Sequence, residues 1–139
     1  MSREILSENP ERSINKIPWP ELHPLGFAFF RNIYLRDSLW KDYLTGDPSP
    51  RTLSILAHER THIKRLGNNI KLQVKYWSDP GFRLQEELAA IHEEMKVLKT
   101  HNEKFTIDER ARDLSSVAYL WCTDYETAKS KLENVWKEI

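Results

Sequence analysis

Apolar and aromatic side chains first become dense in residues 27–35, directly after Gly26, where only Arg31 and Asn32 interrupt them. Stretches rich in aromatic and β-branched residues are typical of strands. The segment therefore predicts one or two short strands, or a hairpin. The preceding residues 1–25 carry four prolines among scattered charges, and we expect them to form an irregular N-terminal arm.

A dense turn signal follows at residues 46–50, which have the sequence GDPSP. Ser49 is suited to cap a helix N-terminus, and Pro50 is suited to the first helical position, where its missing N–H is not needed. Further along, Gly67 is typical of a helix end. We expect a helix over residues 50–66.

A second turn signal, SDPG at residues 78–81, precedes a longer periodic stretch. Five apolar residues then recur at alternating spacings of four and three: Leu84, Leu88, Ile91, Met95 and Leu98. This is the period of an amphipathic helix.

Two capping-box patterns, Thr106 with Glu109 and Thr123 with Glu126, predict two further helices. Apolar residues at helical spacing follow the first box as far as Trp121 and follow the second to the end of the chain. The expected fold class is therefore α+β, mostly helical with a small N-terminal sheet.

The length and the charge balance restrict the class of protein. A chain of 139 residues is suited to one domain with a single core, so we expect residues 1–139 to form one unit. With 21 Lys and Arg against 21 Asp and Glu, the formal net charge is +0, so the uniformly basic surface that drives non-specific nucleic-acid or membrane binding is absent. The sequence has no apolar run of membrane-span length and no segment of signal-peptide type. A cytoplasmic location without a membrane partner is expected.

One string places metal-binding residue types at a metal-binding spacing, HERTH at residues 58–62. The single cysteine, Cys122, excludes Cys-x-x-Cys pairs, so any metal site must use His and carboxylates. A separation of four puts His58 and His62 one turn apart on the same helix face, where both imidazoles can reach one ion at about 2.0 to 2.1 Å. The string predicts a metal site on the helix of residues 50–66.

The position of these residues on the helix supports a metal. With His58 at zero and about 100° per residue, His62 falls at about 40° and Glu59 at about 100°. Both angles lie within the arc of apolar residues, which includes Ile55 and Leu56. A carboxylate buried beside two imidazoles is costly unless it is paired, and a divalent cation supplies that pairing. The alternative is a helix with two satisfied core histidines and a solvated glutamate.

These residues resemble a known family. LAHERTHIKR, residues 56–65, resembles the active-site helix of zinc metallopeptidases of the zincin class. The extended metzincin string has a further His six residues after the second, and Asn68 occupies that position here. The resemblance is therefore to the gluzincin branch, in which a Glu on a following helix is the third ligand. The segment RLQEELAAIHEEM, residues 83–95, is similar to that helix, whereas the charged Arg60 departs from many zincins.

The resemblance covers residues 27–98 and extends, more loosely, to small bacterial and phage gluzincin-like domains. It implies a Zn²⁺ cofactor held by His58, His62 and a Glu, and hydrolysis of peptide bonds in a peptide or protein substrate. It further implies that Glu59 is the general base that takes a proton from the metal-activated water. The strand of residues 32–35, NIYL, occupies the place of the edge strand that pairs with substrate.

Two adjacent glutamates compete for the role of third ligand. With Leu84 at zero, Glu87 falls at about 300°, at the border of the buried stripe, and Glu86 falls at about 200°, toward solvent. In the family, the ligand Glu is followed by a bulky apolar residue and then by Ala, as Glu87 is by Leu88 and Ala90. We expect Glu87 to be the ligand.

Other assignments stay open at this point. The oxyanion donor is sought among Tyr76, His92, Tyr119 and Tyr125, each of which also suits a packing role. A zincin-fold module that binds zinc or a partner without turnover is the main alternative to a peptidase. A third hypothesis is an accessory nucleic-acid binder, because residues 60–78 carry five cations and no acid.

Overall fold

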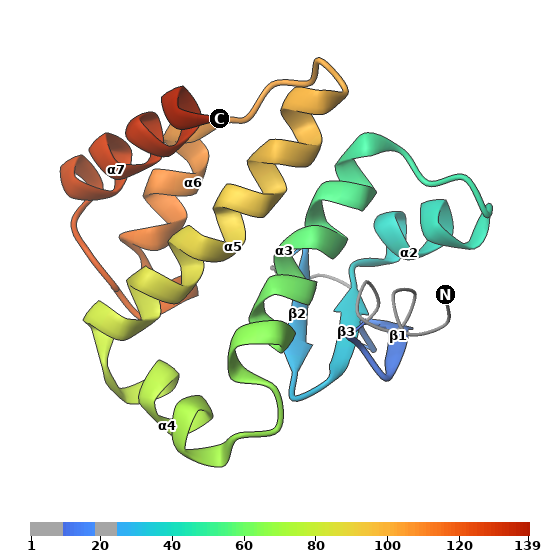
Figure 1. Cartoon of the computed structure of the whole chain (residues 1–139), viewed down its shortest axis with the longest axis horizontal. Coiled ribbons are helices and arrows are strands. Elements are labelled where there is room, and N and C mark those ends of the chain that lie inside the picture. Colours follow the sequence, from blue (N-terminus) through green and yellow to red (C-terminus); the bar gives the residue numbers. More distant parts are fainter. Residues whose placement is uncertain (1–9, 19–24) are drawn as a thin grey trace.

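The computed structural model describes residues 10–18 and 25–139, and its fold is α+β, as the sequence predicts (Figure 1). A small sheet precedes a set of helices. The elements are β1 (Ser13–Lys16), β2 (Gly26–Phe29), β3 (Asn32–Leu35), α2 (Asp37–Leu44), α3 (Pro50–Leu66), α4 (Ile70–Ser78), α5 (Pro80–Thr100), α6 (Ile107–Leu114), the 3₁₀ turn η1 (Val117–Tyr119) and α7 (Tyr125–Glu138).

The sheet confirms the predicted hairpin and corrects the expectation that the whole N-terminal arm is irregular. β2 and β3 are antiparallel, and Phe30 in the turn between them has a left-handed φ of 55°. The arm was expected to be irregular, but its residues 13–16 form β1, which pairs parallel to β3. A local pattern cannot show this, because the partner strand supplies the hydrogen bonds. The rest of the predicted arm lies partly outside the described residues.

The strand order is β1-β3-β2, so residues 32–35 are the central strand and not the edge strand that the resemblance implies. β1 is hydrogen-bonded to the edge of β3 that β2 leaves open. The edge beside α3 is β2, and Gly26 is needed there because a Cβ on it would lie 3.0 Å from Ile55 Cγ2 and 3.1 Å from the Tyr34 carbonyl oxygen. The absence of a side chain lets β2 lie close to α3.

Helix α3 has the predicted bounds. Gly67, with φ 54°, ends it and donates its N–H to the Ile63 carbonyl at 2.8 Å. The Ser49 side chain does not cap the helix. Instead, Asp42 Oδ2 accepts hydrogen bonds from the Ser49 N–H at 2.8 Å and from the Thr52 hydroxyl at 2.6 Å, which ties α2 to the first turn of α3.

The helices after α3 differ from the sequence expectation in three places. The sequence predicts no helix for residues 70–78, which are singled out only for their cations, and they form α4. α6 ends at Leu114, well before Trp121, which has a left-handed φ of 50°. Helix α7 is capped by Asp124, whose side chain accepts from the Thr127 N–H, and not by Thr123.

The buried apolar side chains form two clusters, where one core was expected. One joins α5, α6 and α7 and is centred on Ile91, Met95, Leu114 and Leu132. The other joins the sheet with α2 and α3. Helices α3 and α5 pack directly against each other, so their polar facing side chains lie between the two clusters. Within the described ranges, none of the helices combines the length and apolar composition needed to cross a membrane.

Candidate metal centre

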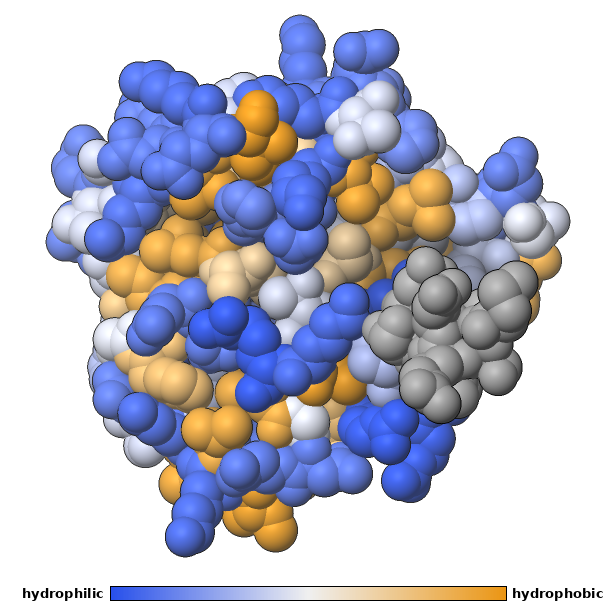
Figure 2. All heavy atoms as spheres, viewed as in Figure 1, coloured by the Kyte–Doolittle hydropathy of each residue, from blue (hydrophilic) through white to orange (hydrophobic). Residues whose placement is uncertain are grey.

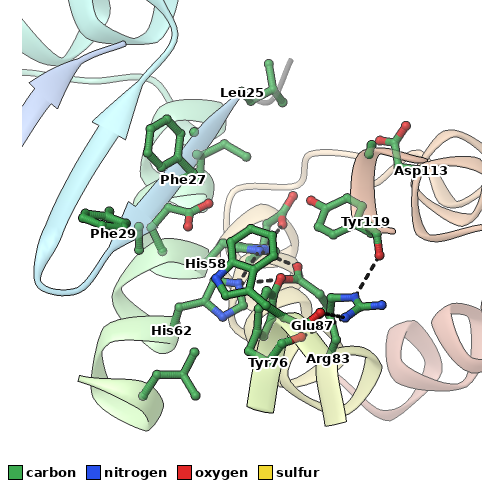
Figure 3. Close-up of a pocket in the computed structure, with 18 of the residues that line it drawn as sticks. Leu25, Phe27, Phe29, His58, His62, Tyr76, Arg83, Glu87, Asp113 and Tyr119 are labelled. Carbon is green, nitrogen blue, oxygen red and sulfur yellow. Dashed lines mark hydrogen bonds and ion pairs between the residues drawn. The ribbon is translucent and has the colours of Figure 1, made fainter. Parts of the chain in front are cut away.

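Three predicted ligands meet between α3 and α5 (Figure 3). His58 and His62 come from α3, one turn apart, and their Nε2 atoms are 3.2 Å from each other. Glu87 of α5 faces both: its Oε1 lies 3.1 Å from His58 Nε2, and its Oε2 lies 2.9 Å from His62 Nε2. Two imidazole nitrogens and one carboxylate therefore converge on one point, as the sequence predicts.

The charges of the cluster favour a cation at this point. Burial alone would lower the pKa of His58, but the carboxylates of Glu59, Glu87 and Glu94 outweigh it and raise the pKa to about 10. Burial would likewise raise the pKa of Glu87, yet His62 and His58 hold it well below its usual value. The carboxylates thus stabilise positive charge on the facing imidazoles.

Glu94 orients the first histidine from behind. It is 2% exposed, and its Oε1 lies 2.7 Å from His58 Nδ1, which leaves Nε2 directed at Glu87. Arg110 of α6 donates two hydrogen bonds to the Glu94 carboxylate, at 2.8 and 2.6 Å. Burial would raise the pKa of Glu94, but Arg110 and His58 lower it to about 2. A carboxylate that holds the second nitrogen of a ligand histidine is a common feature of metal sites.

Glu59 has the environment expected of a base. It is 5% exposed, and burial raises the pKa of its carboxyl. It lines the cleft over the histidines. One ligand atom of Glu59 lies within 4.8 Å of those of His58 and His62, so these three could themselves hold an ion. Glu87 is closer to both imidazoles and has both oxygens turned toward them.

Glu86 does not face solvent as expected. It is 2% exposed, because Arg65 of α3 donates two hydrogen bonds to its carboxylate, each at 2.8 Å. Leu84, which the apolar period places at the centre of the buried face, is only partly buried. Glu86 and Glu87 are both buried, so the buried face of α5 is displaced from Leu84 toward the glutamates.

A cleft of about 710 Å³ opens above the cluster. Its floor carries the histidines with Glu59 and Glu87, and the residues of β2 form one side. Tyr76 and Tyr119 come from the other side (Figure 3). Burial raises the pKa of both phenols, with Glu87 as the next cause, so both stay protonated donors.

The four candidate oxyanion donors differ in position. Tyr76 donates its hydroxyl to Glu87, whereas the Tyr119 hydroxyl has no hydrogen-bond partner in the part of the chain that the structure describes. His92 instead pairs with Glu93, and the Tyr125 hydroxyl donates to Asp108; neither lines the cleft.

Arg83 fixes this side of the cleft. It is 3% exposed and donates to four main-chain carbonyls, those of Tyr76 at 2.8 Å, Trp77 at 3.2 Å, Tyr119 at 2.9 Å and Leu120 at 3.0 Å. The end of α4 and the segment after α6 are thereby held at α5.

The residues present fit a zinc ion. Two imidazoles and one carboxylate are the donor set of open catalytic zinc sites, whereas calcium and magnesium prefer oxygen ligands alone. His62 Nδ1 is buried without a hydrogen-bond partner in the described part of the chain. The hydrogen-bond partners of the His62 ring among the described residues are therefore all at Nε2, the atom that faces Glu87.

The basic stretch of residues 60–78 is partly neutralised. Arg60 donates two hydrogen bonds to Glu11, each at 2.9 Å, and Arg65 is paired with Glu86. Two of the five cations are therefore occupied within the chain.

Sequence reasoning missed Glu94, Arg83 and Arg110. A signal for Glu94 is present, because it follows Glu87 by seven residues and so returns to the same face of α5. The two arginines carry no such signal, since their partners lie on other elements.

Comparison of the chain with protein-family models, with curated proteins and with solved structures finds no match. The geometry of the site therefore carries the assignment of function.

Proposed function

We propose that this protein is a zinc-dependent peptidase of the gluzincin type. The observation that carries the proposal is the convergence of His58, His62 and Glu87, beside a buried Glu59 that reaches the cleft. Zinc held by those three side chains would supply an activated water and polarise the scissile carbonyl.

The chain's own residues have separable roles in this mechanism. Glu59 takes a proton from the attacking water and passes it to the leaving amine. Glu94 keeps His58 oriented through Nδ1, and Arg110 keeps Glu94 ionised. The Tyr119 hydroxyl, which has no hydrogen-bond partner among the described residues, is suited to donate to the oxygen of the substrate carbonyl, where negative charge develops.

The test combines metal analysis with cleavage of a broad peptide library. We expect about one zinc per chain, loss of cleavage on chelation and its return with added zinc. His58→Ala and His62→Ala should each abolish stoichiometric zinc, and full zinc in both variants would contradict the site.

Glu59→Gln separates a peptidase from a non-catalytic module. It should keep zinc and fold while the cleavage rate falls by about 10²-fold or more. A zinc-loaded wild-type protein that cleaves no peptide would instead support a zinc-binding module without turnover.

A further inference from the structure

The large apolar side chains that this chain exposes are concentrated in one region. Among the described residues seven are exposed, and five of these lie on α4 or directly after η1: Ile70, Val74, Trp77, Leu120 and Trp121. We call these five residues the apolar patch. In the surface view, apolar side chains are exposed at the lower edge of the molecule, in the region where Figure 1 places α4 (Figure 2). Scattered single apolar residues are normal on a protein surface, whereas a contiguous group marks a binding surface.

Arg83 holds the two segments of the apolar patch together. Its buried guanidinium donates to the Trp77 carbonyl at 3.2 Å and to the Leu120 carbonyl at 3.0 Å. One side chain thus places the end of α4 beside the segment that follows η1. Both segments expose apolar side chains there, so the patch is continuous.

The backbone at Leu120 and Trp121 adopts a conformation that is rare for residues with a side chain. Their φ angles are 52° and 50°, in the left-handed region. The side chains are 40% and 63% exposed, so their burial does not offset the cost of this conformation. Residues held in a sparsely populated conformation tend to cluster at functional sites. The fold therefore keeps these two apolar side chains in solvent at a cost, which supports a role in contact.

Two lysines flank the apolar patch along α4. With Ile70 at zero, Val74 and Trp77 fall within about 60° of one another, and Lys71 and Lys75 follow at about 100° and 140°. Both lysines are exposed. Within the described residues the lysines that pair with an acid are others: Lys16, Lys41, Lys96 and Lys129. The exposed apolar stripe of α4 thus lies beside two positive charges without an ion pair.

The opposite side of α4 faces the protein. Leu72 and Tyr76 fall at about 200° and 240° on the same scale and are partly buried, and α4 packs against α5. A helix with an exposed apolar face, a tryptophan and flanking lysines has the composition of helices that lie in the interfacial layer of a membrane. Tryptophan suits that layer because its ring is apolar and its N–H is polar.

We propose that the apolar patch, with Lys71 and Lys75, docks this protein peripherally on an anionic lipid surface. The apolar side chains enter the interfacial layer, and the two lysines contact the anionic headgroups. The formal net charge of +0 speaks against a uniformly basic surface, but residues 60–78 carry five cations and no acid. This inference goes beyond the proposed peptidase and does not rest on it.

A second copy of the chain suits the patch less well. Pairing about a two-fold axis brings the same surface of both copies together, so Lys71 and Lys75 would face the same lysines of the other copy. The segment of residues 60–78 has no acid to neutralise them. Like charges across an interface weaken association, whereas anionic headgroups attract basic side chains.

Co-sedimentation of the full chain with lipid vesicles measures the docking. Phosphatidylcholine vesicles with about 30% phosphatidylserine should bind the protein at least about tenfold more tightly than vesicles of phosphatidylcholine alone. Added salt should weaken this binding, because it screens the lysines. Absence of binding to the phosphatidylserine vesicles, or equal binding to both kinds of vesicle, would overturn the proposal.

A matched pair of variants tests the apolar patch. Val74→Asp and Leu44→Asp each place an acid on an exposed helical position, at 58% and 61% exposure, and only Val74 belongs to the patch. Val74→Asp should weaken vesicle binding about tenfold or more, and Leu44→Asp less than about threefold. Circular dichroism checks that both variants are folded. Equal effects of the two variants would overturn the role of the patch.

A second matched pair tests the lysines at constant net charge. The double variant Lys71→Gln and Lys75→Gln should weaken binding to phosphatidylserine vesicles about tenfold. The control is Lys131→Gln with Lys137→Gln, on the exposed side of α7, and should weaken it less than about threefold. Equal losses would show attraction by overall charge alone and would overturn the proposal.

Sedimentation velocity without lipid examines the second copy as the occupant. The protein should show no association that depends on its concentration. Association that Val74→Asp abolishes, in a protein that does not bind vesicles, would assign the patch to a second copy and overturn the proposal. None of these measurements uses cleavage or zinc, so failure of the peptidase assays and failure of vesicle docking are separate results.

Discussion

Glu86 and Glu87 are adjacent and both buried, yet each is bound to a different part of α3. Glu87 faces His58 and His62, whereas Glu86 is held by Arg65. Neighbouring positions on a helix differ by about 100°, so one turn of α5 supplies both a candidate ligand and a structural ion pair.

Glu87→Ala should weaken zinc binding by more than about 100-fold, which exceeds the usual effect of outer-shell changes. Glu86→Ala should leave zinc affinity nearly unchanged and lower the free energy of unfolding, because it removes only the pair with Arg65. Competition with a chromophoric chelator measures the first quantity and urea denaturation the second. A larger zinc defect in Glu86→Ala would show that the ligand assignment is wrong.

Glu94→Gln should lower zinc affinity about 10- to 100-fold, because it weakens the hold on His58 Nδ1 and leaves Arg110 without its ionic partner. Glu93→Gln is the matched control, since Glu93 is the next residue, is 40% exposed and pairs with His92 and Lys96. Equal zinc affinity in the two variants, measured by the same chelator competition, would remove Glu94 from the site.

At the scale of elements, the junction of α2 and α3 depends on one carboxylate. Asp42 binds the Ser49 N–H and the Thr52 hydroxyl, and the hydrogen bond from Thr52, followed by that from Ser49, lowers its pKa. A carboxyl whose pKa is lowered in the folded state stabilises the fold above its unfolded pKa, near 3.8. That stabilisation is lost as the pH falls through the lower folded value.

Asp42→Ala should therefore lower the melting temperature at pH 6 and have a smaller effect at pH 3. Thermal denaturation followed by circular dichroism at both pH values tests this. Asp47→Ala, in the same turn, is the control and should show no such pH dependence. An equal loss for Asp42→Ala at both pH values would contradict the assignment.

The elements that the sequence predicts well are those whose local pattern and tertiary packing agree. α3 is an example, because its turn residues, its terminal Gly67 and its apolar arc all indicate the same bounds. In α4, Ile70, Val74 and Trp77 recur at helical spacing, but the helix has only nine residues and none of them is buried, so packing does not reinforce the local pattern. The apolar period after Thr106 continues to Trp121, but the chain leaves the helix at Leu114.

The reason for that early end lies elsewhere in the sequence. Arg83, on α5, binds the carbonyls of Tyr119 and Leu120 and holds the chain after α6 in a non-helical path. In the candidate site, too, some residues follow from a local pattern and others only from contacts between distant segments. Its α3 residues follow from one motif, whereas Glu94 and Arg110 act through contacts that only the folded chain creates.

At the scale of the whole molecule, the candidate metal centre lies between two apolar clusters. His58 and His62 belong to α3, which packs with the sheet, and Glu87 belongs to α5, which packs with α6 and α7. A ligand bound by both helices connects the two clusters directly. Because such a ligand binds only the folded chain, it stabilises the whole fold.

Zinc at about 100 times its dissociation constant should stabilise the fold by ~2.7 kcal/mol, which for this chain length raises the melting temperature by about 10 °C. Chelation should reverse the shift, and His62→Ala should abolish it. Differential scanning calorimetry provides the measurement. A melting temperature that does not respond to zinc in the wild-type protein would contradict the centre, whatever the peptidase assays give.

The close approach of β2 to α3 at Gly26 affects the shape of the cleft. A methyl group at this position would meet Ile55 Cγ2 and the Tyr34 carbonyl, so the strand would have to shift by a few tenths of an ångström. β2 forms one side of the cleft and the histidine helix forms its floor, so the shift would alter the shape of the cleft. The lack of a side chain at Gly26 thus sets the distance between β2 and α3. Gly26→Ala would change that distance, and with it the shape of the cleft, without altering a charged group.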